Sequence, residues 1–362
     1  MCAPRLASAG GSFLETLGSE AFGLYREQKE QCCLVDIKEW KVNHTGVVIV
    51  SVSGPDAAKF LQGIITNDIK LLDSGICSLY ALFLNTKGRV MCDAILYRVK
   101  EDTFFVDCDV SALSMLEKHM KLYRVRSSVN ITLADDHRIS AVYDPSKIES
   151  VLGHTVKSPN VDHSSVFSIM DCNKQIKSLF SENNLHFYND PRLPILGLRI
   201  TSLKDVDIEN EVVNKDVSIK KTALYTNYRY KLGIGEVPEI PNGVCFPFEI
   251  NADFLHGISF DKGCYIGQEL TARTYHTGIV RKRIMPFYSD KLLTNVQLGA
   301  PIENPDGSKV PIGKFLAADG FVGIAIVRVK EALALEKLKM GSYLLKTVLP
   351  AWWPDGEQNL NK

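Results

Sequence analysis

The sequence predicts an α+β protein in which two mixed α/β units precede a C-terminal domain built of strands. At 362 residues the chain is too long for one small core, so two or three domains are expected. In its first half, runs rich in β-branched residues alternate with apolar residues at helical spacing. From about residue 276 onward only short strand-like runs between turns remain, which favours a small β-barrel over residues 276–362.

The first unit, residues 33–136, contains the clearest elements. Residues 46–53 are rich in valine and predict a strand, which Gly54-Pro55-Asp56 ends where a helix begins. Apolar residues then recur at helical spacing from Ala57 to Ile65. Farther along, Asn85-Thr86-Lys87-Gly88 separates two strand-like runs and predicts a hairpin. The other predicted elements are strands at residues 79–84, 90–99 and 104–108 and an amphipathic helix at residues 111–123.

The second unit, residues 137–224, consists of short apolar runs between polar turns. Helical spacing resumes over residues 222–231. The aromatic tail with Trp352 and Trp353 should pack against the protein rather than extend into water. Strands are predicted at residues 139–142, 166–170 and 195–200 in the second unit, and at 301–303, 310–315 and 321–329 in the barrel.

Composition excludes several classes of partner and fold. Basic and acidic residues number 42 each, so no net field draws the chain to nucleic acid or to an acidic membrane. No apolar run is long enough to cross a bilayer. The nine scattered cysteines are typical of a reducing compartment rather than of a secreted disulfide-bonded module. Residues 1–32 hold four glutamates and only two arginines, which favours a mobile N-terminal arm over a mitochondrial presequence.

The densest chemistry lies around Cys264. This thiol follows a lysine and a glycine and precedes a helix-like run. A thiol at a helix N-terminus beside a cation has a stabilised thiolate, which is the form that attacks electrophiles and ligates metals. The alternative is a small buried cysteine packed under the start of a helix. The functional interpretation is favoured by the residues that surround this cysteine in the sequence: Lys262, Gly263, Tyr265, Gly267, Gln268, Glu269 and Arg273.

Three further features each have two interpretations. Five basic residues between positions 262 and 283, including Arg281, accompany one acid, which indicates either a local anion site or an exposed charged strand. Glu249 and Asn251 lie among apolar residues and either hydrogen-bond a flat heterocycle or face water from a strand. Asp93 enters an apolar strand, either as a general base or as the partner of a structural arginine.

Residues 262–273 carry a resemblance to a known family. Their pattern, Lys-Gly-Cys-Tyr-x-Gly-Gln-Glu-x-x-Ala-Arg, resembles the signature of folate-binding aminomethyltransferase-like proteins that serve iron–sulfur cluster maturation and are related to the glycine-cleavage T-protein. Residues 52–57, 60–68, 83–89 and 257–260 support it. The barrel region and its aromatic tail resemble the mitochondrial branch, whose members act late in [4Fe-4S] cluster assembly.

The resemblance implies a three-domain ring closed by the barrel, with tetrahydrofolate in a central channel. It implies that residues 225–275 return to the first domain after the second domain, residues 137–224. Within the channel it implies Glu249 as the pterin-binding acid and a folate-contacting arginine near residues 279–283, for which Arg281 is chosen; Asn251 is the additional candidate from the residue pattern. Asp93 matches one carboxylate of the pair found in true aminomethyltransferases, whereas Cys92 stands where the other is found.

The predicted function is therefore an assembly factor of the mitochondrial matrix that binds tetrahydrofolate and serves [4Fe-4S] maturation. Cys264 is expected to ligate a transient iron–sulfur cluster shared with an A-type carrier protein, and the chain is expected to be a monomer when free. Two alternatives stay open. One is a folate-dependent aminomethyl or one-carbon transferase that uses Asp93, and the other is a non-catalytic interaction module with a vestigial folate channel.

Overall fold

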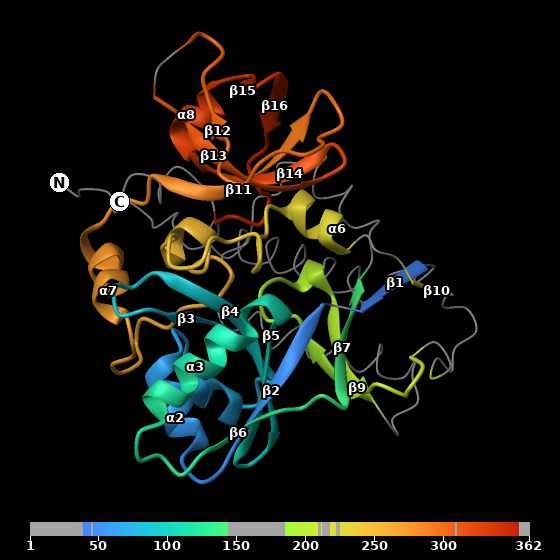
Figure 1. Cartoon of the computed structure of the whole chain (residues 1–362), viewed down its shortest axis with the longest axis vertical. Coiled ribbons are helices and arrows are strands. Elements are labelled where there is room, and N and C mark those ends of the chain that lie inside the picture. The colour runs from blue at the N-terminus through green and yellow to red at the C-terminus, as the bar shows by residue number, and fades with distance from the viewer. Residues whose placement is uncertain are drawn as a thin grey trace, which may run out of the picture.

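The computed structural model describes residues 39–44, 46–143, 185–208, 211, 218–221, 225–307 and 310–354. These residues form three sheets, with the C-terminal sheet above the other two in Figure 1. The predicted combination of mixed α/β units with a C-terminal barrel is confirmed. The predicted arm at residues 1–32 and the strand predicted at 166–170 lie outside the described residues.

The first sheet has the strand order β3-β4-β5-β2-β6, with each neighbouring pair antiparallel. Two helices cover one of its faces, because the apolar sides of α2 and α3 share a core cluster with β2 to β5. The predicted hairpin joins β3 to β4 and turns at Gly88, whose φ is +71°. The bounds are β2 (Val47–Ser53), α2 (Ala57–Ile64), β3 (Ser78–Leu84), β4 (Val90–Lys100), β5 (Thr103–Asp109), α3 (Leu113–Arg124) and β6 (Asn130–Leu133).

The second sheet has the order β10-β1-β7-β9-β8. Its first strand along the chain, β1, pairs in parallel with β10 and antiparallel with β7. The predicted start of the first unit at residue 33 therefore does not coincide with the sheets, because β1 precedes β2 in the chain but pairs in the second sheet. The bounds are β1 (Glu39–His44), β7 (His137–Tyr143), β8 (Leu185–Asn189), β9 (Leu198–Leu203) and β10 (Ser218–Lys221).

The strand predicted at residues 195–200 begins as a different element. Pro194–Leu196 forms a 3-10 helix with its proline at the first position, where no backbone N–H is needed. Gly197 then reverses the chain at φ +77°, and β9 starts only at Leu198. The apolar run of residues 195–200 thus spans two elements, and periodicity alone does not separate them.

The segment after the second sheet returns to the first. It contains α6 (Tyr225–Leu232), which packs against barrel strands, and the 3-10 helix η4 (Pro247–Ile250). The backbone of Val90 exchanges hydrogen bonds with Gly243 and Cys245, and Ser259 donates to the carbonyl of Thr66. From Gly243 onward this segment therefore contacts the first sheet, while the domain boundaries that the resemblance implied for residues 225–275 stay a prediction.

The third sheet curls into a nearly closed barrel with the order β12-β13-β14-β11-β16-β15. Glu303 and Lys339 join its two ends by exchanging backbone hydrogen bonds of 2.8 and 2.9 Å. The aromatic tail packs as predicted, because the indole N–H of Trp352 donates to the carbonyl of Leu232 at 2.7 Å. The bounds are β11 (Lys282–Ser289), β12 (Pro301–Ile302), β13 (Gly313–Asp319), β14 (Val322–Arg328), α8 (Val329–Ala334), β15 (Leu338–Met340) and β16 (Tyr343–Thr347).

One hydrophobic cluster connects all three sheets. It contains Tyr80 from the first sheet, Tyr143 from the second and Ile324 from the barrel, with Tyr228 of α6 between them. Because a single core spans the units, their relative placement is set by packing and not by linkers. Among the described helices, none has the length and apolar character needed to cross a membrane.

Candidate functional site

Cys264 is exposed on the loop that leads into α7 (Gln268–Thr277). The alternative of a cysteine sealed in the core is therefore wrong. The helix-like run predicted after the cysteine is α7, and Cys264 precedes its first residue, Gln268, by four residues. An ideal Cβ placed on the neighbouring Gly263 meets nothing within 4 Å. The thiol is thus open to a macromolecular partner.

Lys262 points inward, away from the solvent that Cys264 faces. Its ammonium donates to the carbonyl oxygens of Gln62, Ile65 and Asn67, each at 2.7 Å. An ammonium has three donors, so these acceptors use all of them. Burial lowers the pKa of Lys262 to about 7, opposed by the nearby carboxylate of Asp68. The role predicted for Lys262, a cation that stabilises the thiolate, is replaced by that of an anchor for the loop.

Two of the carbonyls, those of Gln62 and Ile65, lie at the C-terminal end of α2, where a helix leaves backbone oxygens without internal partners, and the third, of Asn67, lies in the turn that follows. Lys262 therefore closes one helix end with a side chain from a loop almost two hundred residues later. The backbone N–H of Ile266 adds a bond of 3.0 Å to the carbonyl of Gly63 on the same helix. The loop on both sides of Cys264 is thus tied to α2.

Gly267 fits the loop against the β3–β4 hairpin. Its φ is +80°, and a Cβ there would lie 2.5 Å from the carbonyl oxygen of Asn85 and 3.1 Å from the Cα of Gly88. Only glycine accepts this combination of backbone angle and contact. Tyr265 is buried behind the loop, and its N–H donates to the side chain of Gln268. The cysteine signature and the hairpin are therefore one packed unit.

The remaining residues of the signature are on α7. Glu269 and Arg273 pair across one helical turn, and both side chains are largely exposed. Such a pair adds only a few tenths of a kcal/mol to the helix. Arg281 follows α7 and is also exposed. The structure therefore leaves these charges on the surface.

Asp93 lies elsewhere, on β4 in the interior. One carboxylate oxygen accepts the N–H of Val237 at 3.0 Å, and the other lies 3.4 Å from the hydroxyl of Tyr80. Burial, followed by the charge of Glu236, raises the pKa of Asp93 to about 7. No ion pair joins it to an arginine within the described part of the chain. This carboxyl group is suited to hold a proton near neutral pH.

Asp93 borders a network of buried charges, here called the inner polar cluster, which the sequence interpretation missed. Arg199 joins the two sheets, because its guanidinium contacts Asp107 of β5 at 3.0 Å and Asp190 after β8 at 3.1 Å. Burial raises the pKa of Asp190, but the charge and hydrogen bonds of Arg192 together with the charge of Arg199 outweigh it and lower the pKa to about 2. The members of the cluster are Asp107, Asp190, Arg192, Arg199, Arg229, Glu236 and Glu239.

A signal for part of the cluster was present in the sequence. Asp107 and Arg199 each interrupt an apolar run that forms a buried strand, and a charge in such a place needs a partner. What the sequence does not show is that the two charges meet. Asp190 followed by Arg192 resembled an ordinary polar turn, although both side chains are buried.

The residues predicted to bind a pterin are largely engaged by the protein itself. Glu249 lies in the 3-10 helix η4 and not in a strand, and one of its carboxylate oxygens accepts the N–H of Phe246 at 2.9 Å. Asn251 is fully buried at φ +61°, and its amide donates to the carbonyl of Ile284 at 2.9 Å. The buried arginine of this region is Arg283, which pairs with Asp253 at 2.8 Å. Asn251 therefore connects η4 to the barrel.

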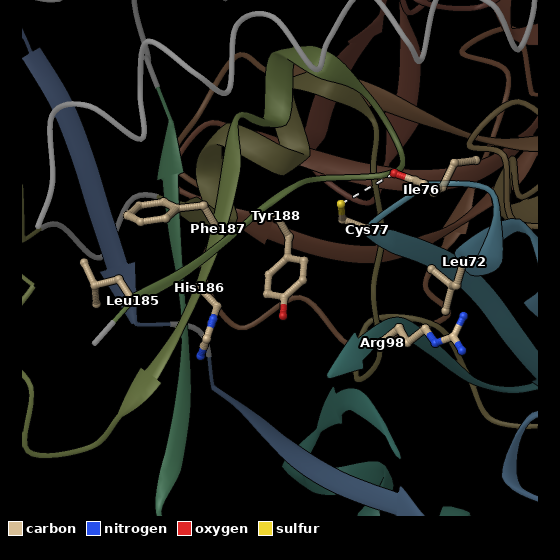
Figure 2. A pocket seen from close by; sticks show the side chains of 9 residues that line it. Leu72, Ile76, Cys77, Arg98, Leu185, His186, Phe187 and Tyr188 are labelled. Atoms are coloured by element: carbon tan, nitrogen blue, oxygen red, sulfur yellow. Dashed lines mark hydrogen bonds between the residues drawn. The ribbon is translucent and has the colours of Figure 1, made fainter. Parts of the chain in front are cut away.

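Two cavities lie at the junction of the first and second sheets. The smaller, beside Asp93, is bordered by Asp107, Arg199 and Glu236 and has a volume of about 20 Å³. The larger, of about 420 Å³, opens beside Cys77, Arg98 and His186 (Figure 2). Neither is lined by the predicted folate residues Glu249, Asn251 or Arg281.

These cavities test whether tetrahydrofolate fits. A volume of about 20 Å³ has room for one water molecule and not for a pterin ring. The larger cavity has volume enough for part of such a ligand, but Arg98 at its rim is already paired with Asp73. Neither of these two cavities is therefore a ready pterin site. Among the described residues, no group of three or more His, Cys, Asp or Glu side chains is placed to hold a metal ion.

Comparisons with known proteins decide the family. A family described as the GCVT N-terminal domain matches residues 19–174, and one described as the CAF17 C-terminal beta-barrel domain matches residues 281–355. The iron-sulfur cluster assembly factor IBA57, mitochondrial, of Mus musculus is 33% identical over 327 residues, which cover 85% of this chain and 84% of that protein. The protein of the same name from Homo sapiens is 33% identical over 326 residues, with the same coverage of both chains.

The chain belongs to the IBA57 family. A more distant member, the homolog from Neurospora crassa, is 32% identical over 333 residues, which cover 82% of this chain and 71% of that protein. Among solved structures, the glycine cleavage system aminomethyltransferase T from Bartonella henselae matches with a TM-score of 0.63. That match covers 90% of this chain and 89% of the other at 14% identity, so it shows a shared fold. The resemblance stated from residues 262–273 is confirmed.

The structure offers two candidate places for chemistry, the Cys264 loop and the interior around Asp93. The cysteine signature that carried the resemblance forms a rigid, exposed unit with the β3–β4 hairpin. Asp93 and its cavity, by contrast, occupy the centre of a fold shared with an aminomethyltransferase. The two places are chemically different, since one offers a thiol to the solvent and the other holds a buried carboxyl group.

Proposed function

We propose that this chain acts in mitochondrial iron–sulfur cluster maturation, with Cys264 as a ligand to a cluster that it shares with a partner. The relatives that share a third of its residues are named mitochondrial iron–sulfur cluster assembly factors. The observation that carries the role of the cysteine is its exposure on a loop anchored by Lys262 and Gly267. We further propose the matrix as the location and an A-type carrier protein as the partner that brings the other thiolate ligands, with a [4Fe-4S] cluster as cargo.

The chemistry asked of the chain is limited. A thiolate ligates iron and a thiol does not, so Cys264 has to release its proton when it binds the cluster. Because the side chain is exposed, that proton passes to solvent and no base is needed. The anchors keep the sulfur projecting, which lowers the entropy cost of meeting a cluster held on another protein. The cluster is cargo in this scheme and not a resident group.

The test compares Cys264→Ser with Cys77→Ser, the other described exposed cysteine. Each variant is mixed with a cluster-loaded A-type carrier, and the visible absorption of the cluster and the rate of its transfer to an apo-acceptor are followed. Loss of the shared-cluster spectrum in Cys264→Ser, with Cys77→Ser behaving as wild type, supports the proposal. Unchanged absorption and transfer in Cys264→Ser would remove this sulfur from the mechanism.

Tetrahydrofolate binding is a separate part of the proposal. It is supported by the T-protein fold and by an interior carboxyl group, Asp93, that holds a proton near neutral pH. Since the cavity beside Asp93 accommodates one water, binding at that place requires the cavity to widen. Calorimetry with reduced folate tests this: no binding heat at millimolar ligand would leave the interior as a structural unit.

One-carbon transfer has weaker support. Where the transferases have a second carboxylate, this chain has Cys92, which is fully buried and donates its S–H to the carbonyl of Asp93 at 3.0 Å. A thiol held in this way does not replace an ionised acid. Turnover of an aminomethyl donor with tetrahydrofolate, lost in Asp93→Asn, would revive this alternative.

A further inference from the structure

The helix that follows Cys264 is exceptionally exposed. Of the ten residues of α7, only Thr271 is buried. A ten-residue helix has little stability of its own in water, and an isolated one would not persist. In Figure 1, α7 stands at one edge of the molecule, between the Cys264 loop and the first barrel strand. Most of its surface is therefore available to a partner.

Apolar side chains project from this region on both sides of the cysteine. Tyr275 and Ile279, in and after the last turn of α7, are 53% and 55% exposed. Val244, in the loop that contacts the β3–β4 hairpin, is 58% exposed. Tyr275 also stacks on Phe260 with ring centroids 3.7 Å apart, so its ring is held in one orientation. A rigid, half-exposed tyrosine is typical of the anchor residues of protein interfaces.

The charges around these side chains are mainly positive. Arg281 and Lys282 lie exposed just beyond α7, and Lys87 lies exposed in the hairpin turn that contacts Gly267. The one acid on the helix, Glu269, is neutralised by Arg273. The protein as a whole has no net charge, so this local excess is a feature of the surface and not of the composition. It complements an acidic surface.

We propose that Cys264 and the outer face of α7 form one docking surface for an acidic face of the protein that brings the cluster. This surface, the α7 surface, comprises Lys87, Val244, Cys264, Tyr275, Ile279, Arg281 and Lys282. The inference rests on the proposed function and deepens it by naming the chemistry of the partner. An iron–sulfur cluster held by thiolates is itself anionic, so a basic surround favours its approach.

The α7 surface is elongated. Ten helical residues span roughly 15 Å at 1.5 Å per residue. The loop before α7 and the start of β11 after it lengthen this strip toward the dimensions of a standard interface, which covers about 800 Å² per partner. The inner carbonyl anchors of Lys262 face the opposite way, so docking does not disturb them.

The experiment measures the affinity of a cluster-loaded A-type carrier for the full chain by calorimetry at two salt concentrations. Tyr275→Ala and Ile279→Ala are expected to weaken binding about tenfold each, as truncated anchors do. Arg281→Glu is expected to weaken binding at the lower salt concentration and to flatten the dependence of affinity on salt. Leu203→Ala and Lys204→Glu, on exposed positions of the second sheet, serve as controls and should bind as wild type.

The outcomes distinguish a failure of the docking proposal from a failure of Cys264 as a cluster ligand. If the α7 variants bind within twofold of wild type, or if the wild-type chain does not bind the carrier, the docking proposal is overturned. If those variants bind normally while Cys264→Ser loses the shared cluster, the proposed function stands without this surface. If they weaken binding while Cys264→Ser still shares the cluster, the surface stands and the role of the sulfur fails. Sedimentation of the chain alone supplies a last check, because self-association abolished by Tyr275→Ala would assign the face to a second copy and overturn the proposal.

Discussion

Replacement of Lys262 by methionine tests the central structural claim about the loop. Methionine keeps the length and the apolar stem of lysine but removes all three donors, leaving three backbone carbonyls at the end of α2 without the ammonium. A buried polar group left unpaired costs about 1–3 kcal/mol. Water reaches part of this site because Gln62 is half-buried, and loss of the buried charge returns some desolvation cost. We therefore expect the free energy of unfolding to fall by about 2–4 kcal/mol.

The same substitution should change the response to pH. The pKa of Lys262 is lowered to about 7 in the folded protein from an ordinary value of 10.5. Between these values the unfolded chain binds more protons than the folded one, so this group makes stability rise with pH from about 7 to 10.5. Wild type should accordingly gain stability relative to Lys262→Met over that window. A constant difference from pH 6 to 10 would show that the three carbonyls keep the amine charged throughout.

Urea unfolding gives the free energies, and alkylation of Cys264 reports on the loop. Alkylation is measured in a Cys77→Ser background, so that one described exposed thiol remains. Lys262→Met should change the alkylation rate as the loop leaves its anchored conformation, whereas Lys59→Met, on the exposed side of α2, should change neither quantity. If Lys262→Met unfolds at the wild-type urea concentration and its thiol reacts at the wild-type rate, the anchor argument is refuted.

Three further outcomes are expected from the same unfolding assay. Gly267→Ala should lose about 2–4 kcal/mol, because its φ of +80° and a backbone oxygen 2.5 Å from the new Cβ both oppose a side chain, while Gly263→Ala, with open space, should stay within about 0.5 kcal/mol of wild type. The pKa of Asp93 is raised from 3.8 to about 7, so between these values this group binds more protons in the folded than in the unfolded chain, and stability falls as the pH rises. Asp93→Asn should remove this slope, which is up to about 1.4 kcal/mol per pH unit. Unfolding curves from pH 4 to 8 measure it. Arg199→Met should cost about 3–5 kcal/mol by leaving two buried aspartates without their shared cation, and a loss below about 1 kcal/mol would contradict the assignment of the cluster as the joint between the sheets.

Local pattern predicted the elements of the first sheet well, for a physical reason. The run at residues 46–53, the helix after Gly54 and the hairpin at Asn85 to Gly88 are determined by neighbours in the chain. Alternation, helix starts and turn residues act over a few positions, so they can be read in order. The barrel was predicted less completely. The run at residues 321–329 matches β14, but the run at 310–315 covers only the start of β13, and β11, β15 and β16 were not identified.

Pairing between distant segments could not be predicted from the same signals. β1 pairs with β10, which follows it by well over a hundred residues, and nothing in Glu39–His44 specifies that partner. Lys262 was close to Cys264 in sequence and was therefore assigned to it, although its ammonium donates instead to three backbone carbonyls at and just after the end of α2. The sequence indicated that Arg199 and Asp107 would each be a buried charge, but it did not indicate that the two residues pair with each other. Nearness in the chain misled the assignment of Lys262. For the other two pairs, the sequence contained no signal that identified the partner.

The inward turn of Lys262 changes where charge for an anionic cluster has to come from. Because Lys262 is engaged at the end of α2, it stabilises the loop but offers no charge to the sulfur, so in the proposed role the loop supplies position and one ligand only. Exposed positive charge lies farther out, at Lys87, Arg281 and Lys282, where it is solvated and weak until a partner excludes water. If the docking proposal holds, ligation and charge complementarity are placed on different elements, and they act together only when a second protein covers both.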